Sequence, residues 1–128
     1  MNERNIAIRR ILMPKDTNPR GEVFGGAILA EIDLAGAIET RRHTLHDVAT
    51  RCMNGIEFKR PVAIGDVVTF YTSLVRIGTT SITVKVEVEF SRDGQEAPVA
   101  VTATEVVYVA VKRLPDGSIT KVPVKGDV

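Results

Sequence analysis

Hydrophobic and polar positions follow two different periods along the chain, and the change falls near residue 48. Over residues 27–38 nearly every residue is apolar or small, with Glu31 and Asp33 as the exceptions. This composition is typical of a helix that is buried over most of its circumference. Apolar residues then alternate with polar ones, most regularly over residues 82–91. That period of two predicts a strand with one buried and one wet face.

Turn residues bound the other elements. Strands are predicted over residues 6–13, 48–58, 67–77, 82–91 and 99–112, with a short edge strand and a frayed tail in 113–128. No second helix is available to cover the apolar helix, so a curved sheet must do so. The prediction is an α+β fold in a single domain over residues 1–128, with its core in about 6–112, in which a curved antiparallel sheet wraps one long central helix.

Asp33 is the anomaly of the predicted helix. Its neighbours one turn away are Leu29, Ala30, Gly36 and Ala37, so no lysine or arginine of the same helix can pair with its carboxylate. The pattern leaves two interpretations open. The carboxylate either reaches solvent or a structural donor, or it carries chemistry.

Two glycines, Gly25 and Gly26, stand at the start of this helix. They allow another group to approach the backbone closely, and the first N–H groups of a helix have no partner within it. These groups lie at the positive end of the helix dipole, where an anion or a developing oxyanion is stabilised. The segment therefore offers polarising amides and, about two turns later, a carboxylate.

Composition excludes several classes of function. The net charge of +1 over 128 residues gives no reason to expect nucleic acid or an anionic membrane as partner. No apolar run approaches the roughly 20 residues of a membrane span, and no secretory signal is recognised. A single cysteine, Cys52, fits a reducing compartment, so we expect a soluble cytoplasmic protein in which Cys52 is a buried structural residue.

The only histidines are His43 and His46, at or beyond the predicted end of the helix. Their spacing would suit a metal pair on a continued helix, but no other group of ligands completes such a site. We therefore expect surface histidines and no metal.

Four motifs in order resemble the acyl-CoA thioesterases of the hotdog fold, and among these the short bacterial YciA-like branch, which is related to cytosolic acyl-CoA hydrolases. The resemblance covers about residues 6–112. The motifs are residues 16–26, residues 32–36, residues 58–62 with Gly65 and Asp66, and residues 78–81.

The resemblance implies a catalytic role for four residues. Asp33 matches the helix carboxylate that serves as general base or nucleophile, and Asn18 matches the loop asparagine that works with it. Gly25 and Gly26 match the glycines whose amides face the thioester carbonyl. For Asn18 the residues alone also allow ordinary turn chemistry, because Asn before Pro favours a turn.

The resemblance also implies residues that bind the substrate. Gly78, Thr79, Thr80 and Ser81 match a turn that contacts the CoA arm, although by themselves they would be a hairpin turn. Arg60 matches a basic position beside the CoA site. No cofactor is expected, since CoA is part of the substrate and product. Sites of this family lie between two protomers, so a homodimer is expected, assembled as a trimer of dimers.

Two other functions stay open beside hydrolysis. A hotdog-fold hydratase or dehydratase usually has a histidine in its catalytic pair, and residues 2–42 contain none. A module that binds acyl-CoA without turnover is the third interpretation. The sequence identifies neither the acyl chain length nor the route of hydrolysis, which could use Asp33 as a general base or form a covalent anhydride.

Overall fold

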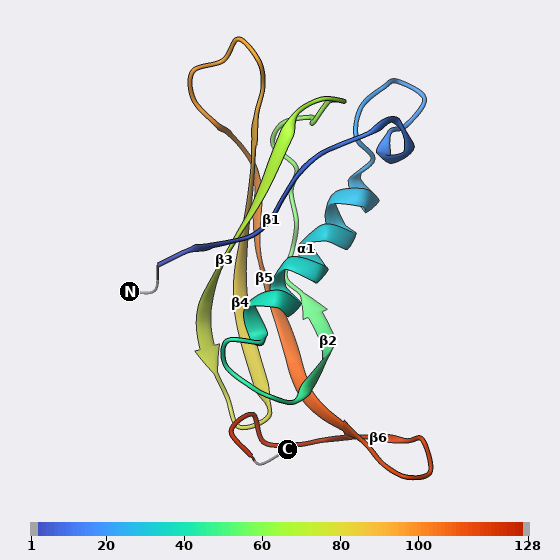
Figure 1. Ribbon diagram of the computed structural model, residues 1–128, viewed down its shortest axis with the longest axis vertical. Helices are drawn as coiled ribbons and strands as arrows, with labels where there is room; N and C mark the ends of the chain where they lie inside the picture. The colour runs from blue at the N-terminus through green and yellow to red at the C-terminus, as the bar shows by residue number, and fades with distance from the viewer. Residues whose placement is uncertain (1–2, 127–128) are drawn as a thin grey trace.

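The computed structural model describes residues 3–126, in which one long helix lies across one face of a six-stranded sheet (Figure 1). A short 3-10 helix, Pro14–Asp16, precedes the long one. The elements are β1 (Asn5–Ile11), α1 (Gly25–Thr40), β2 (Asp47–Met53), β3 (Val67–Ile77), β4 (Ser81–Ser91), β5 (Val99–Arg113) and β6 (Ile119–Lys121). No helix among residues 3–126 is both long and apolar enough to cross a membrane.

Every pair of neighbouring strands is antiparallel, in the order β1-β3-β4-β5-β2, and β6 pairs with the end of β5. The β3–β4 and β4–β5 connections are hairpins, as predicted. In the second hairpin Gly94 has a φ of 85°, which glycine adopts without strain. The predicted fold class, one helix against an antiparallel sheet, is confirmed.

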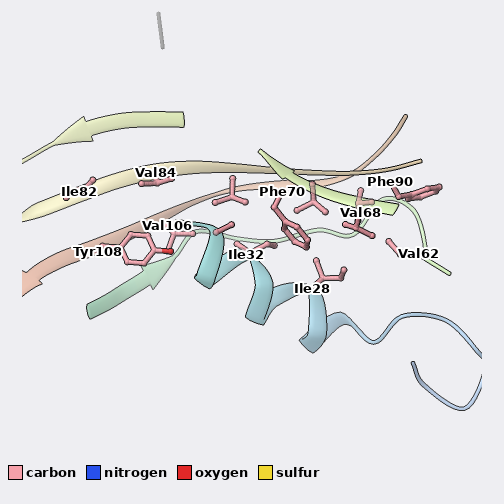
Figure 2. Packing of buried hydrophobic residues seen from close by; sticks show 14 of the residues in the cluster. Ile28, Ile32, Val62, Val68, Phe70, Ile82, Val84, Phe90, Val106 and Tyr108 are labelled. Carbon is pink, nitrogen blue, oxygen red and sulfur yellow. The ribbon is translucent and has the colours of Figure 1, made fainter. Parts of the chain in front are cut away.

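The core forms where α1 meets the middle of the sheet (Figure 2). Ile28, Ile32 and Ala35 follow one another at helical spacing and are buried on the sheet side. Ile32 is fully buried, which contributes roughly 2–3 kcal/mol relative to an exposed side chain. The opposite side of α1 is open, and Leu34 and Ile38 are 58% and 45% exposed there. The sheet thus covers only one side of the helix.

Tyr108 on β5 fixes how closely helix and sheet approach. Its buried hydroxyl donates a hydrogen bond to the backbone carbonyl of Asp33 at 2.6 Å. A Cβ atom at Gly36 would lie 2.1 Å from that hydroxyl, so only glycine fits at this position. Burial raises the pKa of the Tyr108 phenol, and the nearby charge of Asp33 raises it further. Tyr108 therefore stays neutral and can donate its proton in a hydrogen bond. The contact sets the height of Asp33 above the sheet.

Two predictions of regular structure need correction. The strand predicted over 48–58 ends at Met53: the N–H of Asn54 still donates to the carbonyl of Glu105 on β5, but the carbonyl of Asn54 accepts a hydrogen bond from the Thr104 hydroxyl and not from the backbone of β5. The tail predicted to fray is held through Gly126: Val124 is buried, and the ring of His46 contacts the carbonyl of Gly126. Of the predicted tail, residues 127–128 lie outside the described part of the chain.

The prediction that Cys52 is buried is wrong, because its side chain is exposed. Cys52 lies on β2, which forms an edge of the sheet, and the register of β2 against β5 shifts between Thr50 and Cys52. An edge strand has a neighbour on one side only, and such a register shift redirects side chains relative to the two faces of the sheet.

Candidate active site

Asp33 lies in the third turn of α1, with its carboxylate directed toward the edge strand β2. The Thr50 hydroxyl donates a hydrogen bond to Asp33 Oδ1 at 2.6 Å. The Tyr108 hydroxyl also lies close to this carboxylate, and Asp33 forms no ion pair with residues 3–126. The helix therefore presents a carboxylate that Thr50 orients and that no cation of the described residues neutralises, so it can accept a proton or attack.

Thr50 is a site residue that the sequence did not reveal. It lies 17 positions after Asp33 on a different element, and threonine is common in strands. Only the pairing of β2 with β5 places it beside the helix. No local signal in the sequence marks Thr50, because its contact with Asp33 arises from strand pairing.

The start of α1 is uncapped. Phe24 occupies the N-cap position without a side-chain cap, and the first turn holds no acidic residue. The ring of Phe58 would lie 3.4 Å from a Cβ at Gly25, and the Phe24 ring would lie 2.8 Å from one at Gly26. The two glycines thus let aromatic rings approach the backbone, at a helix end whose dipole favours negative charge.

Asn18 lies in the loop before the helix, and its amide is fixed in one orientation. Its side-chain oxygen accepts hydrogen bonds from the backbone N–H groups of Arg20 and Glu22, at 2.9 and 3.2 Å. The backbone of Asn18 also donates to the carbonyl of Glu22 at 2.8 Å. The predicted turn chemistry is therefore present. Because the oxygen is occupied, the NH2 group is the part of the amide that remains available within residues 3–126.

One pocket of about 200 Å³ collects several of the predicted residues. Asn18, Gly25 and Arg60 line it together with Phe58 and Ile28. Arg60 is exposed and donates only to the carbonyl of Lys59 among the described residues. The pocket combines apolar walls, an amide donor and two arginines, of which Arg20 is paired with Glu22 in the same lining, and this suits a ligand with an apolar part and a polar group.

The turn Gly78–Ser81 lies elsewhere, between β3 and β4. The N–H of Gly78 donates to the carbonyl of Ser81 at 2.8 Å, and the N–H of Ala110 donates to the carbonyl of Thr80. Gly78 and Thr79 line a second pocket, of about 480 Å³, near the end of the chain. This turn is the predicted hairpin, and neither of these two pockets is lined by both the turn and Asn18.

Both histidines have partners within the chain. His43 Nε2 lies 2.7 Å from Glu39 Oε2, and His46 Nε2 lies 3.0 Å from the carbonyl oxygen of Gly126. The described residues contain no group of three side chains able to hold a metal ion. His43 thus contacts the last turn of α1, and His46 contacts the last described residues of the chain.

A single chain does not bring Asp33 to the pocket of Asn18. Asp33 follows Gly25 by eight residues, which amounts to about 12 Å along the helix axis. The carboxylate and the amide donors therefore stand apart in one copy of the chain.

Comparisons with known proteins identify the family. The model of the thioesterase superfamily matches residues 20–97. The acyl-CoA thioester hydrolase YciA of Salmonella typhimurium is 38% identical over 123 residues, which are 94% of this chain and 92% of that relative.

Solved structures agree with this match. A hexameric hotdog fold thioesterase of Campylobacter jejuni has a TM-score of 0.83 and 42% identity, over 94% of this chain and 90% of that one. A hexameric thioesterase of Yersinia pestis has a TM-score of 0.82 and 34% identity, over 93% and 95%. The predicted resemblance is confirmed: the chain has the hotdog fold and belongs to the thioesterase superfamily.

Proposed function

We propose that this protein hydrolyses acyl-CoA thioesters, releasing free CoA and a carboxylic acid. The observation that carries the proposal is the Asp33 carboxylate, which Thr50 orients and which forms no ion pair among residues 3–126. The similarity to the acyl-CoA thioester hydrolase of Salmonella typhimurium supports the substrate class.

Hydrolysis adds water across the bond between the acyl carbon and sulfur. In one route Asp33 removes a proton from water, the water oxygen attacks the acyl carbon, and CoA leaves as its thiolate, which is then protonated. In the other, Asp33 attacks the acyl carbon itself, the carbon–sulfur bond breaks and CoA leaves as its thiolate, and water then hydrolyses the resulting anhydride to release the acid and restore the Asp33 carboxylate. Both routes place negative charge on the carbonyl oxygen, which the helix amides at Gly25 and Gly26 would stabilise.

Asn18 would act through its NH2 group. Because its side-chain oxygen already accepts hydrogen bonds from two backbone N–H groups, it is not available to accept a hydrogen bond from water. Its NH2 group can instead donate a hydrogen bond to the carbonyl oxygen of the thioester or to the oxygen of the attacking water.

A complete site would need two copies of the chain. Asp33 and the pocket of Asn18 stand apart in one copy, and the exposed apolar side of α1 beside Asp33 would be covered by a partner. Asp33 of one protomer would then face Asn18, Gly25 and Gly26 of the other. We place the chain in a homodimer, with three dimers in a hexamer, an assembly that the hexameric relatives support.

The substrate would extend from this site toward basic and turn residues. Arg60 lines the pocket of Asn18, and the turn Gly78–Ser81 would contact the CoA arm. No cofactor enters either route, because water and the carboxylate supply the chemistry. A cytoplasmic location remains a prediction from the single cysteine.

Replacing Asp33 with Asn tests the proposal. The amide keeps the size of the side chain and removes its base and nucleophile, so release of free thiol from acyl-CoA esters should fall by about 10²-fold or more. The assay is run over a series of acyl chain lengths, with size-exclusion chromatography on each protein. The matched control is Asp93→Asn, an exposed carboxylate in the β4–β5 hairpin, which should retain wild-type activity.

Two outcomes would contradict the proposal. Equal activity of the wild type and Asp33→Asn would mean that the helix carboxylate is structural. A correctly assembled wild type that releases no CoA from any ester, or that hydrates an enoyl-CoA without releasing CoA, would exclude hydrolysis as the function.

A further inference from the structure

The last described residues of the chain run back against the turn between β3 and β4 (Figure 1). The N–H of Val124 donates to the carbonyl of Thr79 at 2.9 Å, and the Thr44 hydroxyl donates to the carbonyl of Val124 at 2.7 Å. The Val124 side chain is buried. Lys125 is therefore held between the β3–β4 turn and the loop that follows α1, while its own side chain is exposed.

Lys125 lines two adjoining pockets. One, of about 480 Å³, includes Gly78 and Thr79 of the β3–β4 turn. The other, of about 460 Å³, includes Arg41 and Arg42, the two residues that follow α1. Three basic side chains, from the end of the helix and the end of the chain, thus surround one stretch of surface.

The positive charge of these pockets is largely uncompensated. Among residues 3–126, neither pocket has a carboxylate in its lining, and the side chains of Arg41 and Lys125 form no hydrogen bond or ion pair. Arg42 has one acidic neighbour, Glu39, with Nε 3.7 Å from Oε1. Clustered free cations of this kind bind phosphate groups through charge-assisted hydrogen bonds.

We propose that Arg41, Arg42 and Lys125 bind the phosphate groups in the nucleotide half of acyl-CoA. The proposal rests on the proposed function. Arg41 follows Asp33 by eight residues, about 12 Å along the helix axis. An extended pantetheine arm, which joins the thioester to the pyrophosphate, can span that separation. The cations thus recognise the part of the substrate that does not react.

The test compares two esters of the same acyl group, one with CoA and one with pantetheine, which lacks the nucleotide and its phosphates. We would measure kcat and KM for the wild type, Lys125→Gln and Arg41→Gln. Each variant should raise KM for acyl-CoA about tenfold at nearly constant kcat. The ratio of kcat/KM for acyl-CoA to that for acyl-pantetheine should therefore fall about tenfold.

The matched control is Lys85→Gln, an exposed lysine in the middle of β4, which should keep the wild-type ratio. Added salt should lower the ratio of the wild type more than that of Lys125→Gln, because ions screen exposed charges. Adenosine 3′,5′-bisphosphate should compete with acyl-CoA, and should do so more weakly for Lys125→Gln.

The results separate this proposal from the proposed function. An unchanged ratio in both variants would overturn the proposal while leaving thioester hydrolysis intact. Inhibition by the bisphosphate that is not competitive with acyl-CoA would also overturn the proposal, since the cations would then bind a free nucleotide at a site separate from the substrate. If the wild type hydrolysed neither ester, the proposed function itself would fail.

Discussion

At Asn18 the backbone N–H groups of Arg20 and Glu22 donate to the side-chain oxygen, which leaves only the NH2 group for a substrate. This arrangement separates a structural role from a chemical one. The turn needs an acceptor at this atom, which asparagine and aspartate both provide. The proposed reaction needs a donor, which aspartate lacks when ionised.

Asn18→Asp is therefore expected to keep the loop and to lose the activity. Its melting temperature should stay close to that of the wild type, whereas kcat for acyl-CoA should fall about 10²–10³-fold, as for loss of an oxyanion donor. Thermal unfolding and the free-thiol assay measure the two effects separately. The control is Asn54→Asp, on an exposed residue after β2. Full activity of Asn18→Asp would show that Asn18 only shapes the loop.

Single residues were predictable where their chemistry is local. Asp33 stands out because a carboxylate interrupts an apolar helix, and Asn18 because it precedes a proline. Thr50 could not be predicted, since its contact with Asp33 depends on how β2 is placed beside the helix. The prediction that Cys52 is buried was wrong for a related reason. Its exposure follows from the edge position of β2, which no local pattern reveals.

At the scale of elements, the end of α1 is anchored by one buried carboxylate. Glu39 is 2% exposed and accepts hydrogen bonds from Asn5 of β1 at 3.1 Å and from Thr72 of β3 at 2.9 Å, with His43 Nε2 at 2.7 Å. Burial disfavours the charged form of Glu39, but the hydrogen bonds from these partners outweigh it, so its pKa is lowered. The ionised group thus joins the helix to two strands.

This pKa shift predicts a pH dependence of stability. Because the pKa of Glu39 is lower in the folded chain than its ordinary value of 4.5, its contribution is fully present above about pH 4.5 and is lost as the pH falls through the folded pKa. Glu39→Gln should lower the free energy of unfolding by about 2 kcal/mol at pH 7. The difference from the wild type should shrink below pH 4.5.

Urea unfolding of both proteins between pH 7 and pH 3 measures this difference. Glu57→Gln, an exposed glutamate in the loop after β2, is the matched control and should follow the wild type at every pH. A difference between wild type and Glu39→Gln that does not change with pH would show that Glu39 contributes by packing and not by its charge.

Elements with a clear period were predicted closely, and those bounded by side-chain contacts were not. The strand over residues 67–77 agrees with β3 at both ends, because a turn closes each side. The end of β2 depends on the Thr104 hydroxyl, and the order of the tail depends on Thr44, Thr79 and His46. These partners lie far away in the sequence, so no local pattern points to them.

At the scale of the whole molecule, the open side of α1 predicts self-association. Leu34 and Ile38 lie there beside Asp33, and a helix that is apolar on both sides is suited to burial between a sheet and a partner. The fold class followed from the sequence because the sheet of the same chain satisfies one side of the helix. The second side of the helix would be covered by another copy of the chain, and the arrangement of two copies does not follow from the pattern of one sequence.

Leu34→Asp should therefore dissociate the assembly. A charge at the centre of an apolar interface is costly to desolvate, so the protein should elute at a smaller mass in size-exclusion chromatography, and its thioesterase activity should fall about 10²-fold or more because the shared site is lost. Ile64→Asp, at a turn between β2 and β3 where the side chain is 47% exposed, is the control. An active assembly of unchanged mass would contradict the two-chain site.

The contact between Tyr108 and Gly36 also has an evolutionary consequence. Because a Cβ at position 36 would overlap the tyrosine ring and hydroxyl, these two positions cannot mutate independently. A lineage that acquires alanine or serine at position 36 must first, or at the same time, shrink the residue at position 108, and it thereby gives up the hydrogen bond to Asp33. Descendants of this sequence should therefore explore the rest of the helix surface more freely than this one pair.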